Sequence, residues 1–287
     1  WLSNDIASAF ASWKKIKKAA GETPQIMEQE GAVTPERITG SLRFEHVGFS
    51  LNGQEILKDI NLELQPGQTL GIMGMTGSGK TTIVNLIQRF YDVTEGRILL
   101  DGKDIRSYPL DALRASISVV MQDVFLFSDS VSENVKTGKR EELTQGTVEW
   151  ALERAGAAHF VSRLGNGYET VVGERGVGLS GGQKQRISIA RAIAKQAPVL
   201  VLDDAASALD METEQLIQKN LKQVDKVTKI IIGHRISAVR FADEIIVLEN
   251  NEIAERGTHE ELMAAKGRYY RTWCVQYADR KEEELCR

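Results

Sequence analysis

One short stretch, GMTGSGKT from Gly74 to Thr81, restricts the possible folds of this chain more than any other. It matches the pattern G-x-x-x-x-G-K-S/T, in which the backbone N–H groups of a glycine-rich loop and of the next helix surround an anion. The apolar run Thr69 to Gly74 predicts a buried strand before the loop, and Thr81 to Phe90 predicts a helix after it. Strand, loop and helix together predict a phosphate-binding site in an α/β protein.

The residues of this loop also predict the ligand. Lys80 is expected to contact the terminal phosphates of a nucleotide, and the Thr81 hydroxyl is expected to bind Mg²⁺. ATP and Mg²⁺ are therefore the expected bound groups. A glycine turn without a ligand is the alternative, and the flanking strand and helix argue against it. The residues expected to hold the phosphates are Gly74, Met75, Thr76, Gly77, Ser78, Gly79, Lys80, Thr81 and Thr82.

A second stretch, PVLVLDDAASALD from Pro198 to Asp210, ends an apolar run with two adjacent carboxylates. In nucleotidases with this kind of loop, an acid at the end of a neighbouring strand holds the Mg²⁺. Asp203 fits that role and is predicted to be a metal ligand. Asp204 is then expected beside the γ-phosphate, where a carboxylate can orient or deprotonate the attacking water.

The stretch LSGGQ, Leu179 to Gln183, opens another helix, with Ser180 as its cap residue and two glycines that permit close backbone approach. Taken alone, a glycine-rich helix start is more often structural. Beside a phosphate loop and an acid-ended strand, it favours a second anion-binding helix start. Because the first loop already surrounds its own nucleotide, we expect this one to meet the ATP of a partner in a head-to-tail pair of domains.

The order of the remaining segments predicts the architecture. From Ser41 onward, LRFEHVGFSL and INLEL alternate polar and apolar residues and predict antiparallel strands. Residues 124–180 are helix-rich and predict a lobe inserted between two parts of the main sheet. The helices and strands expected after this lobe are Gly182–Lys195, Val199–Asp203, Met211–Leu221, Lys229–Ile232 and Glu244–Leu248. Their alternation predicts a largely parallel sheet with crossover helices.

The start of the chain and its composition add further expectations. Residues 4–20 predict an amphipathic helix and residues 21–40 a linker, in a chain that begins with Trp1 and is expected to be cut from a longer protein. No apolar run reaches the roughly 18–20 residues that cross a bilayer. The net charge of −4 gives no global basic field, so no nucleic-acid partner is expected. Cys274 and Cys286 lack metal-ligand spacing and are expected to be thiols in a reducing compartment.

Taken together, these motifs resemble the nucleotide-binding domain of ATP-binding-cassette (ABC) transporters, specifically the exporters whose membrane helices precede the ATPase on one chain. The resemblance runs from about Ser41 to Tyr277. It implies a P-loop NTPase fold for residues 41–287, with a largely parallel core sheet, an antiparallel β subdomain and an inserted α-helical subdomain at about 124–180. Residues 1–40 resemble the cytosolic end of the last transmembrane helix and its linker.

The resemblance implies further roles. In VVMQD, Gln122 matches a glutamine that contacts Mg²⁺ and the attacking water, and in IIGHR, His234 matches a histidine that senses the γ-phosphate. SALD, Ser207 to Asp210, matches the D-loop, which runs along the dimer interface. GERG, Gly173 to Gly176, resembles an exporter segment that touches the coupling helices of the membrane domain. The residues expected to act in the partner's ATP site are Ser180, Gly181, Gly182, Gln183 and Asp210.

Two positions depart from the family pattern. The residue after the metal-binding aspartate is normally Glu, and here it is Asp204, which is shorter by one methylene, roughly 1.5 Å. An aromatic residue normally stacks on adenine at the end of the first strand, and Leu51 occupies that position here. Phe49, two residues away on the same face, is expected to belong to the core. Leu51 and Ile56 complete the set of residues expected to bind the nucleotide. The two departures, Asp204 and Leu51, are both expected to weaken the chain's own ATP site.

The resulting hypothesis is an ATP-binding and hydrolysing motor domain of an exporter, at the cytoplasmic face of the inner membrane. It would dimerise around ATP, and its intact LSGGQ would complete the site of a partner that carries Glu, which favours a heterodimer. A homodimer that tolerates Asp, or an engineered substitution, is the alternative for Asp204. The alternatives for the function are a non-catalytic regulatory nucleotide-binding module and a soluble ABC ATPase acting on DNA or ribosomes. The last is disfavoured because the chain has neither a long coiled coil nor two cassettes.

Overall fold

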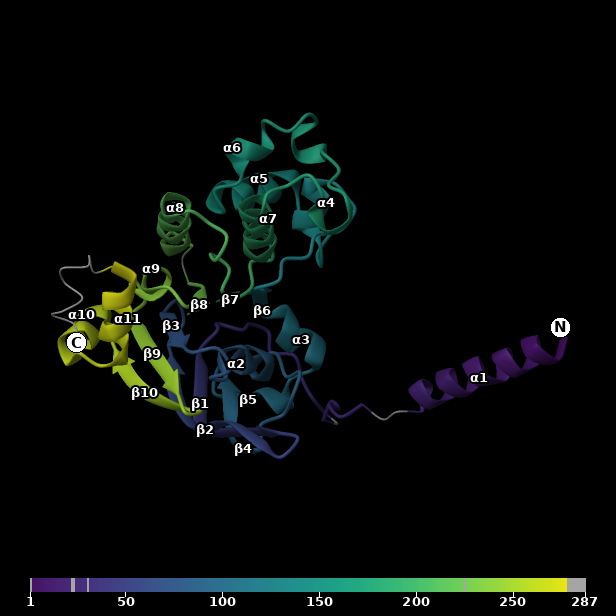
Figure 1. Cartoon of the computed structure of the whole chain (residues 1–287), viewed down its shortest axis with the longest axis horizontal. Coiled ribbons are helices and arrows are strands. Elements are labelled where there is room, and N and C mark those ends of the chain that lie inside the picture. The colour runs from purple at the N-terminus through teal and green to yellow at the C-terminus, as the bar shows by residue number, and fades with distance from the viewer. Residues whose placement is uncertain (1, 22–23, 30, 225, 278–287) are drawn as a thin grey trace.

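The protein consists of a sheet-based body, a helical lobe above it and one helix that stands apart at the N-terminal end, as Figure 1 shows. The computed structural model describes residues 2–21, 24–29, 31–224 and 226–277. The described strands form one six-stranded and one four-stranded sheet. These features confirm the expected α/β fold class with an antiparallel β subdomain and an inserted helical subdomain.

The strands are β1 (Leu42–Leu51), β2 (Gln54–Leu64), β3 (Thr69–Gly74), β4 (Glu95–Leu100), β5 (Lys103–Asp104), β6 (Ile117–Val120), β7 (Val199–Asp203), β8 (Thr228–Ile232), β9 (Glu244–Glu249) and β10 (Glu252–Gly257). The α-helices are α1 (Leu2–Ala20), α2 (Lys80–Ile87), α3 (Leu110–Ala115), α4 (Val131–Lys136), α5 (Gln145–Arg154), α6 (Ala158–Val161), α7 (Gly181–Ala194), α8 (Met211–Lys222), α9 (Ile236–Val239), α10 (His259–Ala265) and α11 (Arg268–Tyr277). Short 3₁₀ turns lie at Ile105–Ser107, Gly167–Glu169 and Glu174–Gly176.

The six-stranded sheet places the expected site residues at one edge. Its order is β10-β9-β3-β8-β7-β6, with β3 parallel to β8 and β9, and β7 parallel to β6 and β8. Every residue of β7 is buried, which explains the continuous apolar sequence of this strand, as in parallel sheets that are covered on both faces. Because parallel strands end at the same edge, the segments that follow β3, β6, β7 and β8 meet there.

The four-stranded sheet has the order β2-β1-β4-β5, and its strand β2 lies against the phosphate loop, since a Cβ atom on Gly79 would meet Leu57. Its side chains share one apolar core with β3 and α2, to which Phe44, Leu57 and Ile83 belong. Phe49 is 4% exposed and its ring centroid lies 5.5 Å from that of Tyr91, so the prediction that Phe49 is a core residue is confirmed.

The helical lobe is built from α4, α5 and α6, and α7 closes it against the sheet (Figure 1). Val135, Leu152 and Ile187 represent an apolar core that these helices share with β7. Since α7 packs in the lobe and leads directly into β7, it connects the lobe to the sheet. Within the described residues, an isolated antiparallel β-bridge joins Ser130 to Val171.

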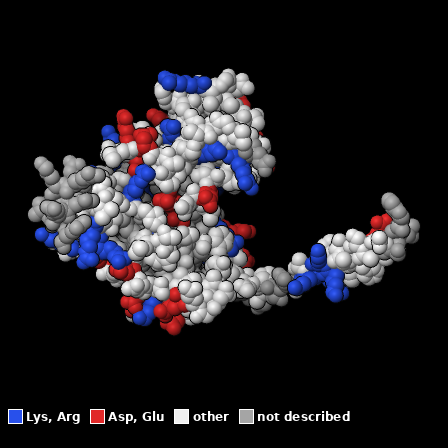
Figure 2. All heavy atoms as spheres, viewed as in Figure 1, with Lys and Arg blue, Asp and Glu red and all other residues white. Residues whose placement is uncertain are grey.

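The apolar side chains of helix α1 are exposed to solvent. Their exposed fractions are 54% for Ile6, 68% for Phe10, 56% for Trp13 and 66% for Ile16. In Figure 2, Lys and Arg gather at the end of α1 that leads into the linker, whereas basic and acidic side chains are interspersed over the body. None of the described helices is both long and apolar enough to cross a membrane.

The linker after α1 is hydrogen-bonded to the body at several places. Arg89 donates a hydrogen bond of 2.9 Å to the backbone oxygen of Met27. The Asp101 carboxylate accepts hydrogen bonds from the backbone N–H groups of residues 39–41. The described part of the linker contains no helix or strand, in agreement with its lack of periodicity.

Two expectations require correction. The helix expected to reach Phe90 ends at Ile87, because Arg89 adopts a left-handed conformation (φ 53°) while its buried side chain pairs with Asp92 at 2.8 Å. The expectation of a free thiol is wrong for Cys274, which is disulfide-bonded, and Cys286 lies outside the described residues.

Candidate functional site

The loop between β3 and α2 has a backbone that glycine adopts at little cost. Gly77 and Gly79 have φ values of 83° and 94°, in the left-handed region. A Cβ atom on Gly79 would lie 2.6 Å from the Leu57 side chain. The loop therefore packs closely on β2, and the first turn of α2 keeps its N–H groups free of intrahelical partners.

Lys80 places a cation inside this loop. It is 7% exposed, and its Nζ donates hydrogen bonds to the backbone oxygens of Gly74 at 2.8 Å and Met75 at 2.7 Å. Burial lowers the pKa of Lys80, and the nearby Asp203 and Asp204 carboxylates oppose that shift. The ammonium group is thus held where the loop would surround a phosphate.

Thr81 and Asp203 bring together the two nucleotide motifs of the sequence. The Thr81 hydroxyl donates a hydrogen bond of 3.1 Å to Asp203 Oδ2. Asp203 is buried, and this burial raises its pKa, whereas the hydrogen bond from Thr81 lowers it. A hydroxyl and a carboxylate at the edge of a phosphate loop are the protein groups that hold Mg²⁺ in nucleotidases with this loop.

Asp204 begins a sharp turn at the end of β7. Its φ is 48°, and its N–H donates a hydrogen bond of 2.9 Å to the Ile232 oxygen of β8. Asp is one of the few residues other than glycine that is often found in this left-handed region. The half-buried side chain therefore leaves the line of the strand directly after Asp203.

One open cavity unites most of the expected residues. Its lining includes Ile56, Thr76, Gly77, Gly79, Lys80, Thr81, Thr82, Gln122, Asp203, Asp204 and His234. Among the described residues, the lining does not extend to Gly74, Met75, Ser78 or Leu51. The structure thus gathers the metal, phosphate and water-positioning candidates around one space and leaves Leu51 outside it.

Two lining residues, Gln54 and Ile232, were not predicted. Gln54 pairs with Leu51 across the turn between β1 and β2, so it occupies the place opposite the expected base contact. The adenine position in the family pattern could have indicated Gln54, because a hairpin partner faces the same space. Ile232 had no comparable indication, since a buried strand end is common.

The groups around the cavity fit a nucleotide with Mg²⁺. The donors are the Lys80 ammonium, the first N–H groups of α2 and the Thr81 hydroxyl, and Asp203 supplies a carboxylate. Ser78 Oγ is buried and has no hydrogen-bond partner among the described residues, so the bonding of the loop is incomplete. A cationic, donor-rich loop beside one carboxylate is the chemistry that a magnesium-bound phosphate requires.

Gln122 and His234 follow β6 and β8, and both are exposed to the cavity. Gln276 of α11 anchors the segment of His234, because its Nε2 donates to the His234 backbone oxygen at 2.7 Å. The Gln276 amide oxygen also accepts a hydrogen bond of 2.9 Å from the N–H of Ile236. Gln276 belongs to no motif, and sequence reasoning missed it.

The LSGGQ stretch forms a capped and exposed helix start away from this cavity. Ser180 Oγ accepts a hydrogen bond of 3.3 Å from the Gln183 N–H, and Gln183 Oε1 accepts one of 2.9 Å from the Ser180 N–H. This capping box bears out Ser180 as the cap residue. A Cβ atom on Gly182 would lie 3.0 Å from the Ala208 oxygen, so the glycines permit close packing on the D-loop.

Asp210, at the end of the D-loop, caps α8. Its carboxylate accepts hydrogen bonds of 2.9 Å and 2.8 Å from the backbone and the hydroxyl of Thr213. These bonds lower the pKa of the exposed Asp210 carboxyl. Within the described residues, neither Asp210 nor the stretch 179–183 lines the nucleotide cavity, so a role of these residues in ATP binding requires a second domain.

Comparison with known proteins agrees with this geometry. The sequence model of the ABC transporter family matches residues 57–207. Over 253 residues the chain is 45% identical to the ATP-dependent lipid A-core flippase of Salmonella typhimurium, an alignment that covers 87% of this chain and 44% of the flippase. It is 46% identical to the protein of the same name from Yersinia pestis bv. Antiqua, over 85% of this chain and 43% of that one.

A solved structure gives the same result for the fold. The structure of a bacterial Atm1-family ABC exporter with ATP bound superposes with a TM-score of 0.89 at 36% identity, over 96% of this chain and 48% of that chain. The chain thus spans about half the length of the relatives that it matches. The expected resemblance and fold are confirmed, and the chain belongs to the ABC transporter family.

Proposed function

We propose that this chain binds and hydrolyses ATP as the motor domain of an ABC exporter. The observation that carries the proposal is the single cavity in which Lys80, Thr81, Asp203 and His234 meet. These side chains come from three separate motifs, and together they supply a cation, a metal site and a γ-phosphate contact.

Each residue has a distinct role in the proposed reaction. Lys80 and the first N–H groups of α2 hold the phosphates, while Thr81, Asp203 and Gln122 hold Mg²⁺. When bound, Mg²⁺ would neutralise part of the charge on the phosphates. Asp204 orients the attacking water, and His234 contacts the γ-phosphate. The Lys80 ammonium exchanges its bonds to the loop carbonyls for bonds to phosphate oxygens.

The domain is proposed to act as one half of a pair. Ser180 and Gly181 are exposed at a helix start, and within the described residues this start does not line the nucleotide cavity. In a head-to-tail pair, the helix start of this chain would lie against the ATP that is bound to the phosphate loop of the second ABC domain. Asp210 would lie along the same interface.

The partner is proposed to be a different ABC domain that carries Glu after its metal-binding aspartate. Asp204 is shorter than Glu by one methylene, and a displacement of about 1 Å can lower a rate ~10²-fold. Leu51 lies outside the nucleotide cavity and offers no ring to adenine. Both residues weaken this chain's own site, while its LSGGQ stretch is intact.

The whole protein is proposed to work at the cytoplasmic face of the inner membrane, with coupling helices of a transmembrane domain docked on this chain. The relatives named above are lipid flippases and an exporter. Residues 1–40 are proposed to descend from the last transmembrane helix, because α1 exposes an apolar stripe and leads into a linker.

ATP turnover measured against chain concentration tests this function. In the absence of that partner, a second copy of this chain would complete the site, which predicts that turnover per chain rises with concentration and then saturates. A non-catalytic regulatory module would bind ATP at every concentration without releasing phosphate, and that result would overturn the proposal. Turnover per chain that is independent of concentration would overturn the paired site alone.

A further inference from the structure

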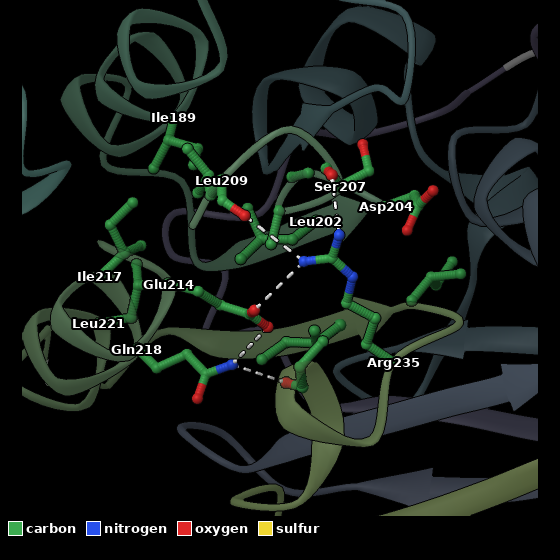
Figure 3. A pocket seen from close by; sticks show the side chains of 15 residues that line it. Ile189, Leu202, Asp204, Ser207, Leu209, Glu214, Ile217, Gln218, Leu221 and Arg235 are labelled. Carbon is green, nitrogen blue, oxygen red and sulfur yellow. Dashed lines mark hydrogen bonds and ion pairs between the residues drawn. The ribbon is translucent and has the colours of Figure 1, made fainter. Parts of the chain in front are cut away.

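The D-loop lies over a second cavity. The cavity lies between α7, β7, α8 and β8, and its lining is mainly apolar, with Ile189, Leu202, Ile217 and Ile231 as examples (Figure 3). The backbone of the D-loop therefore has space beneath it where a loop in a filled core would have packed side chains. Hydrogen bonds to this backbone therefore contribute to its position beside the packing of the buried Leu209 side chain.

Arg235 makes two of these hydrogen bonds. Its Nη2 donates to the Ser207 oxygen at 3.2 Å, and its Nη1 donates to the Leu209 oxygen at 3.4 Å. Arg235 directly follows His234, the proposed γ-phosphate contact. The segment of His234 is therefore hydrogen-bonded to the D-loop through Arg235. A guanidinium suits this task because its planar fork presents several N–H groups in fixed directions.

A buried carboxylate orients the guanidinium from the other side. Glu214 of α8 is 3% exposed, and its Oε2 lies 3.9 Å from Arg235 Nη1. The Ser237 hydroxyl donates to Glu214 Oε1 at 3.0 Å, and Gln218 donates to the Ser237 backbone oxygen at 2.8 Å. Figure 3 shows Arg235 between Glu214 and the two D-loop carbonyls. These bonds join α8, α9 and the D-loop into one unit.

The opposite face of the D-loop is held by α7. Gln185 Nε2 donates to Ser207 Oγ at 3.0 Å, and Gln185 Oε1 accepts a hydrogen bond of 3.0 Å from the Ala208 N–H. Gln185 lies in the helix that begins with LSGGQ. The D-loop is therefore attached both to the helix proposed to reach the partner's ATP and to the segment of His234.

We propose that Arg235 is a positioning residue that fixes the D-loop relative to His234, with Glu214 as its orienting partner. A displacement of the His234 segment then moves the Ser207 and Leu209 carbonyls, and through them the start of α7. The inference rests on the proposed function, because it assigns Arg235 to the coupling of the chain's own ATP site to the partner's site. Arg235 acts through the loop and contacts no nucleotide.

Three variants of the chain test this role. Arg235→Met removes every donor but keeps an aliphatic stem, whereas Arg235→Lys keeps the charge and one carbonyl bond. Arg240→Met is the matched control, since Arg240 caps the same short helix and contacts the Phe241 ring rather than the D-loop. The measurements are hydrogen exchange of the amides of residues 205–210, ATP affinity by calorimetry, and kcat and KM for ATP.

The expected result separates loop position from nucleotide binding. Because Arg235→Met loses two hydrogen bonds to the D-loop, it should speed amide exchange in residues 205–210 and lower kcat by about tenfold. Its ATP affinity should stay within about twofold of the wild-type value. Arg235→Lys should fall between this variant and the wild type, and Arg240→Met should match the wild type in all measurements.

Other outcomes have definite meanings. Unchanged exchange and unchanged kcat in Arg235→Met would overturn the inference, and so would a parallel loss of ATP affinity and melting temperature. If the wild-type chain shows no turnover but Arg235→Met still speeds exchange in residues 205–210, the proposed function fails and the positioning of the loop stands.

Discussion

The Thr81 hydroxyl donates a hydrogen bond to Asp203 across 3.1 Å and 122 positions of sequence. The strands that carry these two motifs, β3 and β7, are separated by β8 in the sheet. The contact therefore reaches past one strand and fixes the phosphate loop relative to the acid-ended strand. A change in either motif is expected to alter the metal position as well as the phosphate position.

Lys80→Ala should weaken ATP–Mg²⁺ binding by about 10- to 150-fold, the loss expected when charge-assisted hydrogen bonds worth ~1.5–3 kcal/mol are removed. Because Lys80 is buried and bonded to two loop carbonyls, the melting temperature should also fall slightly. Calorimetry with ATP and a thermal melt measure the two effects. Unchanged ATP affinity would exclude this loop as the nucleotide site.

Leu51→Tyr should tighten binding of ATP and ADP equally, by about 0.5–1.5 kcal/mol, if the new ring stacks on adenine. Leu51 lies opposite Gln54, which lines the cavity, so a longer side chain at this position can reach the same space. Calorimetry with both nucleotides tests this. A gain for ATP alone, or no gain, would show that Leu51 is not beside the base.

Asp204→Glu should raise ATP turnover roughly 10- to 100-fold, because the longer carboxylate recovers about 1 Å of reach toward the water. The same change should lower the free energy of unfolding by about 1 kcal/mol, since Glu tolerates a left-handed backbone less well than Asp. Phosphate release and urea unfolding measure these opposite effects. Equal turnover in the variant and the wild type would mean that the chain's own site is not impaired.

Ser180→Arg should suppress turnover at a site whose phosphate loop belongs to the other domain. It also removes a cap, at a cost of about 1 kcal/mol of stability, which a thermal melt checks. The sharper test mixes the Ser180→Arg chain with the Lys80→Ala chain. If two domains share each site, the mixture should regain turnover that neither chain has alone, since an intact loop then meets an intact LSGGQ.

One control and one contradicting outcome accompany this experiment. The Ser180→Arg chain should bind ATP with wild-type affinity, because its own loop is unaltered. Nearly full turnover by the Ser180→Arg chain alone would contradict the two-domain site.

Glu214→Gln should change how stability depends on pH. Burial raises the pKa of Glu214 above its ordinary value of 4.5, so the folded chain holds this proton more tightly than the unfolded chain does. The free energy of unfolding contributed by this group is therefore highest below pH 4.5 and falls as the pH rises through the folded pKa.

Urea unfolding between pH 4.5 and 8 measures this effect. The Glu214→Gln variant lacks the ionisation, so its stability should decline less over this range than that of the wild type. Parallel pH profiles for the two chains would contradict a raised pKa.

The motifs could be predicted because each one is local. Consecutive residues encode the phosphate loop, the strand that ends at Asp203 and the helix that begins after Ser180. The alternation of helices and strands predicts that the core sheet is largely parallel. The boundaries of β3 and β7 follow from apolar runs bounded by glycine and by acids.

The residues that support the site could not be predicted in the same way. Gln276 and Arg235 act through backbone contacts with distant segments, and no spacing in the sequence identifies such contacts. The end of α2 depends on the buried side chain of Arg89, which is a tertiary effect. Leu51 was placed by the family pattern, whereas its side chain lies outside the cavity that the fold creates.

The capping box of Ser180 and Gln183 has a consequence for the lifetime of a dimer. In the single domain these two residues satisfy each other, so the N–H groups of Ser180 and Gln183 already have partners before a second domain arrives. A partner's phosphate gains these two N–H donors only by exchange for bonds that already exist, which reduces the net gain. Closure around ATP would then be readily reversed once the phosphate leaves, and a domain that must open in every cycle needs that reversibility.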